Sequence, residues 1–110
     1  MSKWIEICQL DQVLPDSGTC ALVNDKQVAI FRIGNGADQK LYAVDNFDPF
    51  SKANVLSRGL VGDLKGEIVV ASPVYKQHFV LSNGQCQEDE TVQIGTYPIK
   101  VENGMVQVQS

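Results

Sequence analysis

The sequence predicts an all-β fold, an antiparallel β-sandwich or barrel, built as a single domain over residues 1–110. Short apolar segments rich in β-branched residues recur along the chain, and turn residues separate them at close intervals. No segment has a sustained apolar stripe with the 3.6-residue period of a helix. Two Asn-Gly pairs lie between strand-like segments, which is typical of two-residue hairpin turns. These three observations favour short antiparallel strands over helices.

The first half of the chain contains a clear hairpin signal. Its expected strands lie at residues 4–7, 21–23, 27–31 and 41–44. Residues 24–26, which read Asn-Asp-Lys, separate two of these strands and predict a tight turn. Residues 11–14 are expected to make one helical turn before Pro15. The first half is therefore expected to be mostly antiparallel sheet.

The second half contains a buried strand and two expected hairpins. Residues 67–71 form an apolar run with β-branched side chains, which indicates a buried strand. Asn83-Gly84 and Asn103-Gly104 each predict a type I′ turn, in which both central residues have positive φ. For the last hairpin, the predicted opposite pairs are Glu102 with Met105, Val101 with Val106, Lys100 with Gln107, and Ile99 with Val108. Apolar pairs alternate with mostly polar pairs, so one face of this hairpin is expected to be buried.

The charge pattern excludes several kinds of partner. The chain has 9 basic and 13 acidic residues and a net charge of −4. No run of Lys and Arg along the sequence could replace counterions on a nucleic acid or an anionic membrane. There is no apolar stretch of about 18 residues and no signal-like segment. We therefore expect a cytoplasmic protein that binds neither nucleic acid nor membrane.

Cysteine and histidine are too sparse for a common metal site. The three cysteines, Cys8, Cys20 and Cys86, are widely spaced and form no C-x-x-C motif. They are expected to be reduced thiols, some of them packed as small apolar residues. His78 is the only histidine, so a site with several imidazole ligands is excluded.

Two segments resemble the paired cluster-binding loops of the Rieske family. That family has C-P-H followed by Leu-Ser-x-Gly in the first loop, and C-P-x-H-G-x-x-F before a turn glycine in the second. The matching residues are Pro49, Leu56, Ser57 and Gly59 in the first segment, with one extra residue before Leu56, and Pro73, Phe79 and Gly84 in the second. The resemblance implies a Rieske-like fold over nearly the whole chain.

None of the four ligand positions holds a Rieske ligand. A Rieske centre binds two thiolates to one iron and two imidazoles to the other. Here Asp48 and Ser72 stand at the cysteine positions, and Phe50 and Tyr75 stand at the histidine positions. His78 lies three places beyond the second histidine position. The sequence therefore predicts a degenerate loop pair with no 2Fe-2S cluster and no metal.

The missing cluster leaves space that other groups must fill. One hypothesis is that the rings of Phe50 and Tyr75 fill it. The alternative is that the loops close over other core atoms.

Within the Rieske-like proteins, the chain resembles the small subunits of bacterial assimilatory NAD(P)H-dependent nitrite reductases. The residues that carry this resemblance lie at 4–8, 27–32, 48–50, 55–60, 70–73 and 86–90. The resemblance implies a cytoplasmic subunit with no active site of its own. It also implies a large-subunit partner that carries FAD, a 4Fe-4S cluster and siroheme and reduces nitrite to ammonia. The expected partner interface is the loop tip at Pro49, Phe50, Pro73 and Tyr75.

Two other functions remain open at this point. The chain could be a free-standing binding or regulatory module, including one that loads cofactors into another protein. It could also be an electron carrier that holds a cluster through unusual ligands, for which Cys8, Cys20 and Cys86 would have to converge.

Overall fold

The structure is a computed structural model that describes residues 3–34 and 39–109. Its elements in these ranges are β1 (Trp4–Gln9), η1 (Leu10–Gln12), β2 (Ser17–Val23), β3 (Lys26–Ile33), β4 (Lys40–Asp45), β5 (Phe47–Asp48), β6 (Ala53–Asn54), η3 (Leu56–Arg58), β7 (Leu60–Leu64), β8 (Glu67–Ala71), β9 (His78–Val80), β10 (Thr96–Tyr97), β11 (Ile99–Glu102) and β12 (Met105–Gln109). The two η elements are single turns of 3-10 helix. This confirms the predicted all-β fold. Within the described ranges, none of the helices has the length and apolarity needed to cross a membrane.

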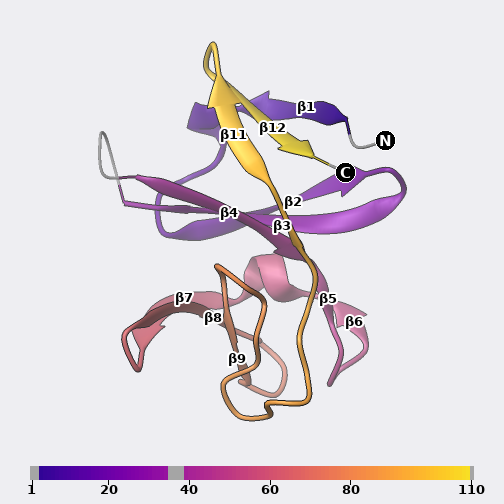
Figure 1. The fold of residues 1–110 in the computed structure, drawn as a ribbon, viewed down its shortest axis with the longest axis vertical. Coiled ribbons are helices and arrows are strands. Elements are labelled where there is room, and N and C mark those ends of the chain that lie inside the picture. The colour runs from indigo at the N-terminus through magenta and orange to yellow at the C-terminus, as the bar shows by residue number, and fades with distance from the viewer. Residues whose placement is uncertain (1–2, 35–38, 110) are drawn as a thin grey trace.

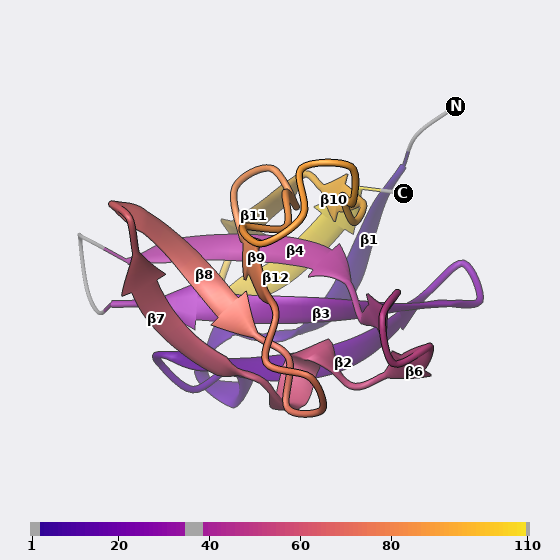
Figure 2. The same ribbon diagram turned by 90° about the horizontal axis from the view of Figure 1, so that it is seen from below.

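The strands form three main antiparallel sheets, which Figure 1 shows one above another. The terminal sheet has the order β1-β12-β11, the central sheet β10-β4-β3-β2 and the distal sheet β7-β8-β9. The small hairpin β5–β6 leaves the end of the central sheet and lies beside the distal sheet (Figure 1). Seen from below in Figure 2, the distal sheet crosses over strands of the central sheet.

Two of the predicted hairpins are confirmed. In the central sheet Val23 pairs with Lys26, so Asn24 and Asp25 form a two-residue turn with positive φ at both positions. Lys26 therefore belongs to the strand rather than to the turn. In the terminal sheet the register of β11 and β12 matches all four predicted pairs, and Asn103 and Gly104 have φ of 54° and 78°. Both turns have the left-handed backbone of a type I′ hairpin.

The predicted type I′ turn at Asn83-Gly84 is wrong. Phe79 bridges to Cys86, so a longer loop joins these segments, and Gly84 but not Asn83 has positive φ. Leu81 is buried in the core and its N–H donates to the carbonyl of Ile68, so this residue continues along β8 instead of pairing across a hairpin with Cys86. The turn is closed by the N–H of Gly84, which donates to the carbonyl of Val80, and by the N–H of Val80, which donates to the carbonyl of Gln85.

The strand β7 was not predicted from the sequence. It pairs with β8, from Leu60 opposite Ala71 to Leu64 opposite Glu67. Lys65 and Gly66 form the two-residue turn between the two strands. Both turn residues have positive φ. A Lys-Gly turn is a weaker signal than Asn-Gly, because lysine enters the left-handed region less readily than asparagine.

The central sheet is buried on both faces because strand β3 supplies side chains to two cores. Val28 and Ile30 pack toward the terminal sheet, while Ala29 and Phe31 pack toward the distal sheet and the loops. All four residues are fully buried. Alternate residues of a strand point to opposite faces, so an uninterrupted apolar run is what a strand between two layers requires.

Candidate functional site

The first loop of the site is fixed to the central sheet by Asn46, a buried residue between β4 and β5. Its side-chain oxygen accepts a hydrogen bond from the N–H of Ser57 at 2.7 Å, and its amide donates to Oε1 of Gln27 at 3.0 Å. Its backbone N–H donates to the carbonyl of Gln27. Sequence reasoning missed Asn46, because a lone asparagine after a strand gives no signal of burial.

A close approach between the two loops explains one glycine of the family motif. An added Cβ on Gly59 would lie 2.3 Å from the carbonyl oxygen of Ala71. Ala71 ends β8 and leads directly into the second loop. Only glycine lets the exit of the first loop pass this closely against that strand.

The two loops are joined directly by Asp48 and Ser72. Oγ of Ser72 donates a hydrogen bond to Oδ2 of Asp48 at 2.5 Å, and both side chains are 0% exposed. The carboxylate of Asp48 also accepts from Oγ of Ser51 and from the N–H of Phe50, each at 2.9 Å. The two residues at the former cysteine positions therefore bind each other and hold the loops together.

The hydrogen bonds around Asp48 keep its carboxyl ionised at neutral pH. Burial raises the pKa of Asp48, but the hydrogen bonds from Ser72, Phe50 and Ser51 favour the charged form and outweigh burial. The net effect is a pKa below its ordinary value of 3.8. A negative charge is thus held between the loops by neutral donors.

The loops also share a turn geometry. The N–H of Lys52 donates to the carbonyl of Asp48 at 2.7 Å, and the N–H of Lys76 donates to the carbonyl of Ser72 at 3.1 Å. Each loop therefore closes a turn of the same length on its member of the Asp48–Ser72 pair. Both lysines have positive φ, of 59° and 67°.

The rings at the former histidine positions have different environments. Phe50 is half-buried and packs against Phe79, with ring centroids 6.2 Å apart and the planes tilted by 44°. Tyr75 is 60% exposed. The hypothesis that both rings fill the space of a cluster is therefore wrong for Tyr75, whose ring lies mostly in solvent.

The remaining predicted interface residues also lie at the surface of the loops. Pro49 and Pro73 are half-buried, and Val74, which sequence reasoning did not single out, is 47% exposed. The tip of the molecule therefore presents prolines and apolar side chains around Tyr75.

The donors near the loops do not fit a 2Fe-2S cluster. Cys86 is buried in the core between the central and distal sheets, Cys8 packs in the other core, and Cys20 is exposed on β2. Burial raises the pKa of the Cys86 thiol. Among residues 3–34 and 39–109, no three His, Cys, Asp or Glu side chains are grouped to hold a metal ion. A carboxylate and a hydroxyl that bind each other are poor substitutes for two thiolates.

His78 anchors a neighbouring loop instead of serving as a ligand. Its Nδ1 lies 2.6 Å from Oε2 of Glu88, and its backbone N–H donates to Oε1 of the same carboxylate. Burial raises the pKa of Glu88, but these contacts with His78 outweigh it and lower the pKa. The pair fixes the loop that follows β9 to the edge of that strand.

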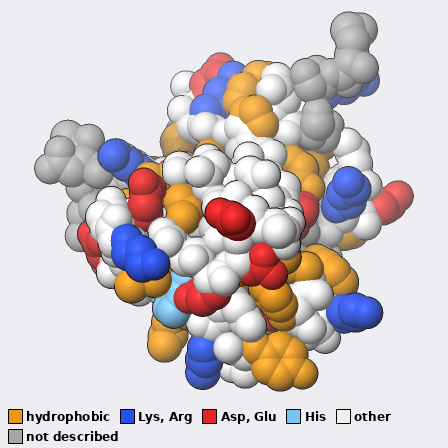
Figure 3. Space-filling view, turned by 60° about the horizontal axis from the view of Figure 1, so that its bottom comes forward, with side chains coloured by type: hydrophobic (Ala, Val, Ile, Leu, Met, Phe, Trp, Pro, Cys, Tyr) orange, Lys and Arg blue, Asp and Glu red, His pale blue; other side chains and the backbone are white. Residues whose placement is uncertain are grey.

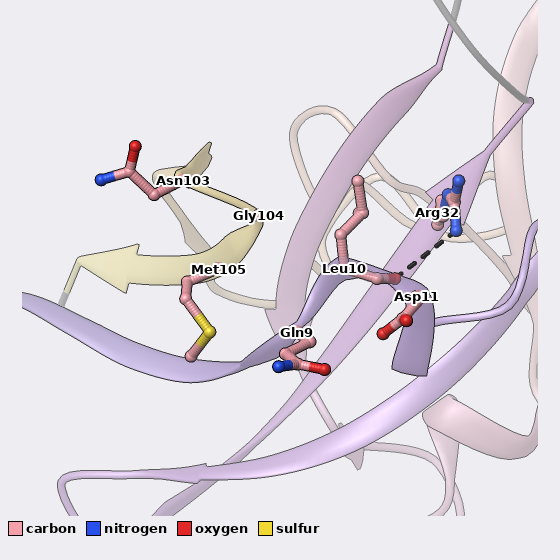
Figure 4. Close-up of a pocket in the computed structure, with 7 residues that line it drawn as sticks. All are labelled: Gln9, Leu10, Asp11, Arg32, Asn103, Gly104 and Met105. Carbon is pink, nitrogen blue, oxygen red and sulfur yellow. Dashed lines mark hydrogen bonds between the residues drawn. The ribbon is translucent and has the colours of Figure 1, made fainter.

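A separate pocket of about 390 Å³ lies between η1 and the β11–β12 turn. Figure 4 shows its seven lining residues, among them Arg32, Asp11 and Met105. Arg32 donates from Nη1 to the carbonyls of Val13 at 3.0 Å and Leu10 at 3.4 Å. These contacts make Arg32 a structural residue that holds η1 against β3.

The stacked sheets and the paired loops define a Rieske-like domain. In agreement, the family described as the Rieske-like 2Fe-2S domain matches residues 3–109. The chain is 49% identical to the NADH nitrite reductase small subunit of Escherichia coli K12 over 109 residues, which is 99% of each chain. The chain thus belongs to the Rieske-like family and, within it, to the nitrite reductase small subunits.

Two further relatives add a structure and a longer polypeptide. The crystal structure of a putative NADH-dependent nitrite reductase small subunit from Mycobacterium tuberculosis has a TM-score of 0.92 and 41% identity, covering 100% of this chain and 96% of that one. The nitrite reductase large subunit of Klebsiella oxytoca is 46% identical over 106 residues, which are 96% of this chain but only 11% of that protein. In this last relative, a domain like this chain is part of a much longer polypeptide.

Proposed function

We propose that this chain is the small, non-catalytic subunit of a cytoplasmic NAD(P)H nitrite reductase, and that it carries no 2Fe-2S cluster. The observation that carries the proposal is the buried hydrogen bond between Asp48 and Ser72. It links the two positions at which a Rieske protein needs thiolates. Within the described residues the three thiols lie in the two cores and on β2, and the imidazole of His78 contacts Glu88. A chain without a cluster has no group to carry electrons and acts through contact.

The partner we propose is the nitrite reductase large subunit, with FAD, a 4Fe-4S cluster and siroheme on that chain. The relative from Klebsiella oxytoca supports this partner, because there a domain like this chain lies within the large subunit itself. Joining two domains in one polypeptide holds them at high effective concentration, which is useful when they must associate. A separate small subunit achieves the same association by docking.

The proposed docking surface is the loop tip at Pro49, Phe50, Pro73 and Tyr75. Aromatic residues are enriched in the cores of protein interfaces, and the ring of Tyr75 is exposed there. Phe50 contributes mainly to packing, since its ring lies against Phe79. The Asp48–Ser72 hydrogen bond keeps the tip preorganised, which lowers the conformational cost of binding.

The test is reconstitution with the cognate large subunit. The large subunit is expressed alone and then with this chain, and complex formation and NAD(P)H-dependent nitrite reduction are measured. We expect a one-to-one complex and higher activity or better cofactor retention when this chain is present. Failure to form a complex would overturn the docking role and favour a free-standing module.

The absence of a cluster is tested on the isolated chain. Iron and acid-labile sulfide are determined after purification under anaerobic conditions, together with the visible spectrum. We expect neither iron nor sulfide. A coloured preparation with a Rieske-type EPR signal would show that the chain is an electron carrier after all.

A further inference from the structure

The paired loops have a charge opposite to that of the whole chain. Residues 47–59 and 72–77 contain three basic side chains, Lys52, Arg58 and Lys76, and all three are exposed. The only acidic residue in these segments is Asp48, which is buried. The chain as a whole has a net charge of −4. The loops therefore present a basic surface on an acidic protein.

The three cations have no carboxylate partner within the described part of the chain. The ion pairs found there join His78 to Glu88 and Lys100 to Glu102. The ammonium of Lys76 lies 3.4 Å from the carbonyl oxygen of Pro73, and this contact leaves its charge uncompensated. The positive charge of the loops is thus available to a partner.

The backbone fixes the positions of two of these cations. Lys52 and Lys76 each close a turn on the Asp48–Ser72 pair, so one buried hydrogen bond sets the spacing of the two turns. Both lysines have positive φ, where glycine is the easier residue. Lys65 in the β7–β8 turn has the same backbone conformation, with φ of 56°. Backbone conformation alone therefore does not mark a binding surface, but Lys65 is a matched control.

Exposed apolar side chains lie between the basic groups. Val74 and Tyr75 precede Lys76 in the second loop, and Leu60, which pairs with Ala71 beside that loop, is 74% exposed. Figure 3 shows hydrophobic side chains gathered at the lower part of the molecule, with Lys or Arg on either side and Asp or Glu above them. An apolar centre with a charged rim is the usual composition of a docking interface.

We propose that the loop surface, formed by Lys52, Arg58, Leu60, Val74, Tyr75 and Lys76, binds an acidic face of the nitrite reductase large subunit with an apolar recess at its centre. This inference rests on the proposed function and adds the chemistry of the partner surface. Tyr75 and Val74 enter the recess, and the three cations face carboxylates around it. Opposite charges at the rim steer association and fix the orientation of the two proteins.

The experiment measures binding of the purified chain to the purified cognate large subunit at about 50 mM and about 300 mM NaCl. K52E, R58E and K76E are each expected to weaken binding roughly tenfold at low salt and to reduce its salt dependence. Y75A is expected to weaken binding roughly 30-fold at both salt concentrations, as for a central anchor residue. K65E, an exposed lysine outside the surface, should bind as the wild type does.

Glycine variants separate charge from backbone effects. K52G and K76G remove the cation and suit a positive φ, so the melting temperature should be kept while binding weakens. K65G should keep both the melting temperature and the binding affinity of the wild type. If the wild type binds and K52E, R58E, K76E and Y75A all bind as tightly as the wild type, this inference is overturned and the subunit role stays intact. No binding by the wild type would instead overturn the proposed function.

Discussion

The two halves of this molecule are held together by different means. Around the terminal and central sheets, strands meet through two-residue turns at Asn24-Asp25 and Asn103-Gly104, and the core between the sheets is aliphatic. Around the distal sheet and the loops, hydrogen bonds of buried polar groups hold the chain together in addition to the apolar core. Asn46 ties the first loop to the central sheet, and Asp48 ties it to Ser72 in the second loop.

This difference shows that protein groups alone can join two loops of the Rieske-like fold. Rieske proteins use a cluster to hold two loops that have little regular structure. In this chain a carboxylate with three donors holds the same two loops. Buried hydrogen bonds to a charged group are among the stronger ones, so a few of them suffice to fix a short loop.

The largest expected effect tests whether the two halves depend on each other. Phe79→Ala empties a fully buried position in the core below the central sheet, and Ile30→Ala does the same in the core above it. Phe79→Ala is expected to lower the free energy of unfolding by about 3–5 kcal/mol and Ile30→Ala by about 2–5 kcal/mol. Both are measured by urea unfolding with fluorescence and circular dichroism. Non-coincident transitions would mean that the halves unfold separately.

The Asp48–Ser72 pair is the next test. Asp48→Ala leaves the hydroxyl of Ser72 and the N–H of Phe50 without their acceptor in a buried site. We expect the free energy of unfolding to fall by about 3 kcal/mol. Ser72→Ala removes one donor and should have a smaller effect, and a double-mutant cycle gives the coupling between the two. A coupling near zero would show that the pair does not hold the loops.

The stability of the folded chain should depend on pH through the carboxyl of Asp48. The pKa of Asp48 is lower in the folded chain than its ordinary value of 3.8. The stability that ionised Asp48 contributes is therefore fully present above the unfolded-state pKa of this carboxyl. It is lost as the pH falls through the folded-state pKa. Asp48→Asn is expected to be less stable by about 2 kcal/mol at neutral pH, and the gap should narrow below about pH 4. A gap that stays constant with pH would contradict an ionised, stabilising Asp48.

The smallest expected effects compare the two rings. Phe50→Ala removes a half-buried ring that packs on Phe79 and should lower the free energy of unfolding by about 1.5 kcal/mol. Tyr75→Ala removes an exposed ring and should change it by less than about 0.5 kcal/mol. Thermal unfolding of both variants provides the comparison. An equal loss for both would show that Tyr75 packs on the molecule after all.

Local sequence signals predicted the terminal and central sheets better than they predicted the distal sheet and the loops. The register of β11 and β12 was predictable because Asn103-Gly104 has one favoured turn and the apolar alternation allows one register. The same Asn-Gly signal failed at residues 83–84, where Leu81 bonds to Ile68 of β8 and Phe79 bridges to Cys86 across a longer loop. Strand β7 was missed because its turn residues, Lys65 and Gly66, give a weaker local signal.

By itself, the sequence determined that the fold is all-β, that it is Rieske-like, and that the cluster-ligand positions hold other residues. It did so because turn preferences and side-chain alternation are local properties, and motif residues can be compared one by one. Only the tertiary structure decided that Asp48 and Ser72 bind each other, that Asn46 is buried, and that Tyr75 is exposed while Phe50 is packed. These facts depend on which distant segments meet, and burial and long-range hydrogen bonds exist only once the chain has folded.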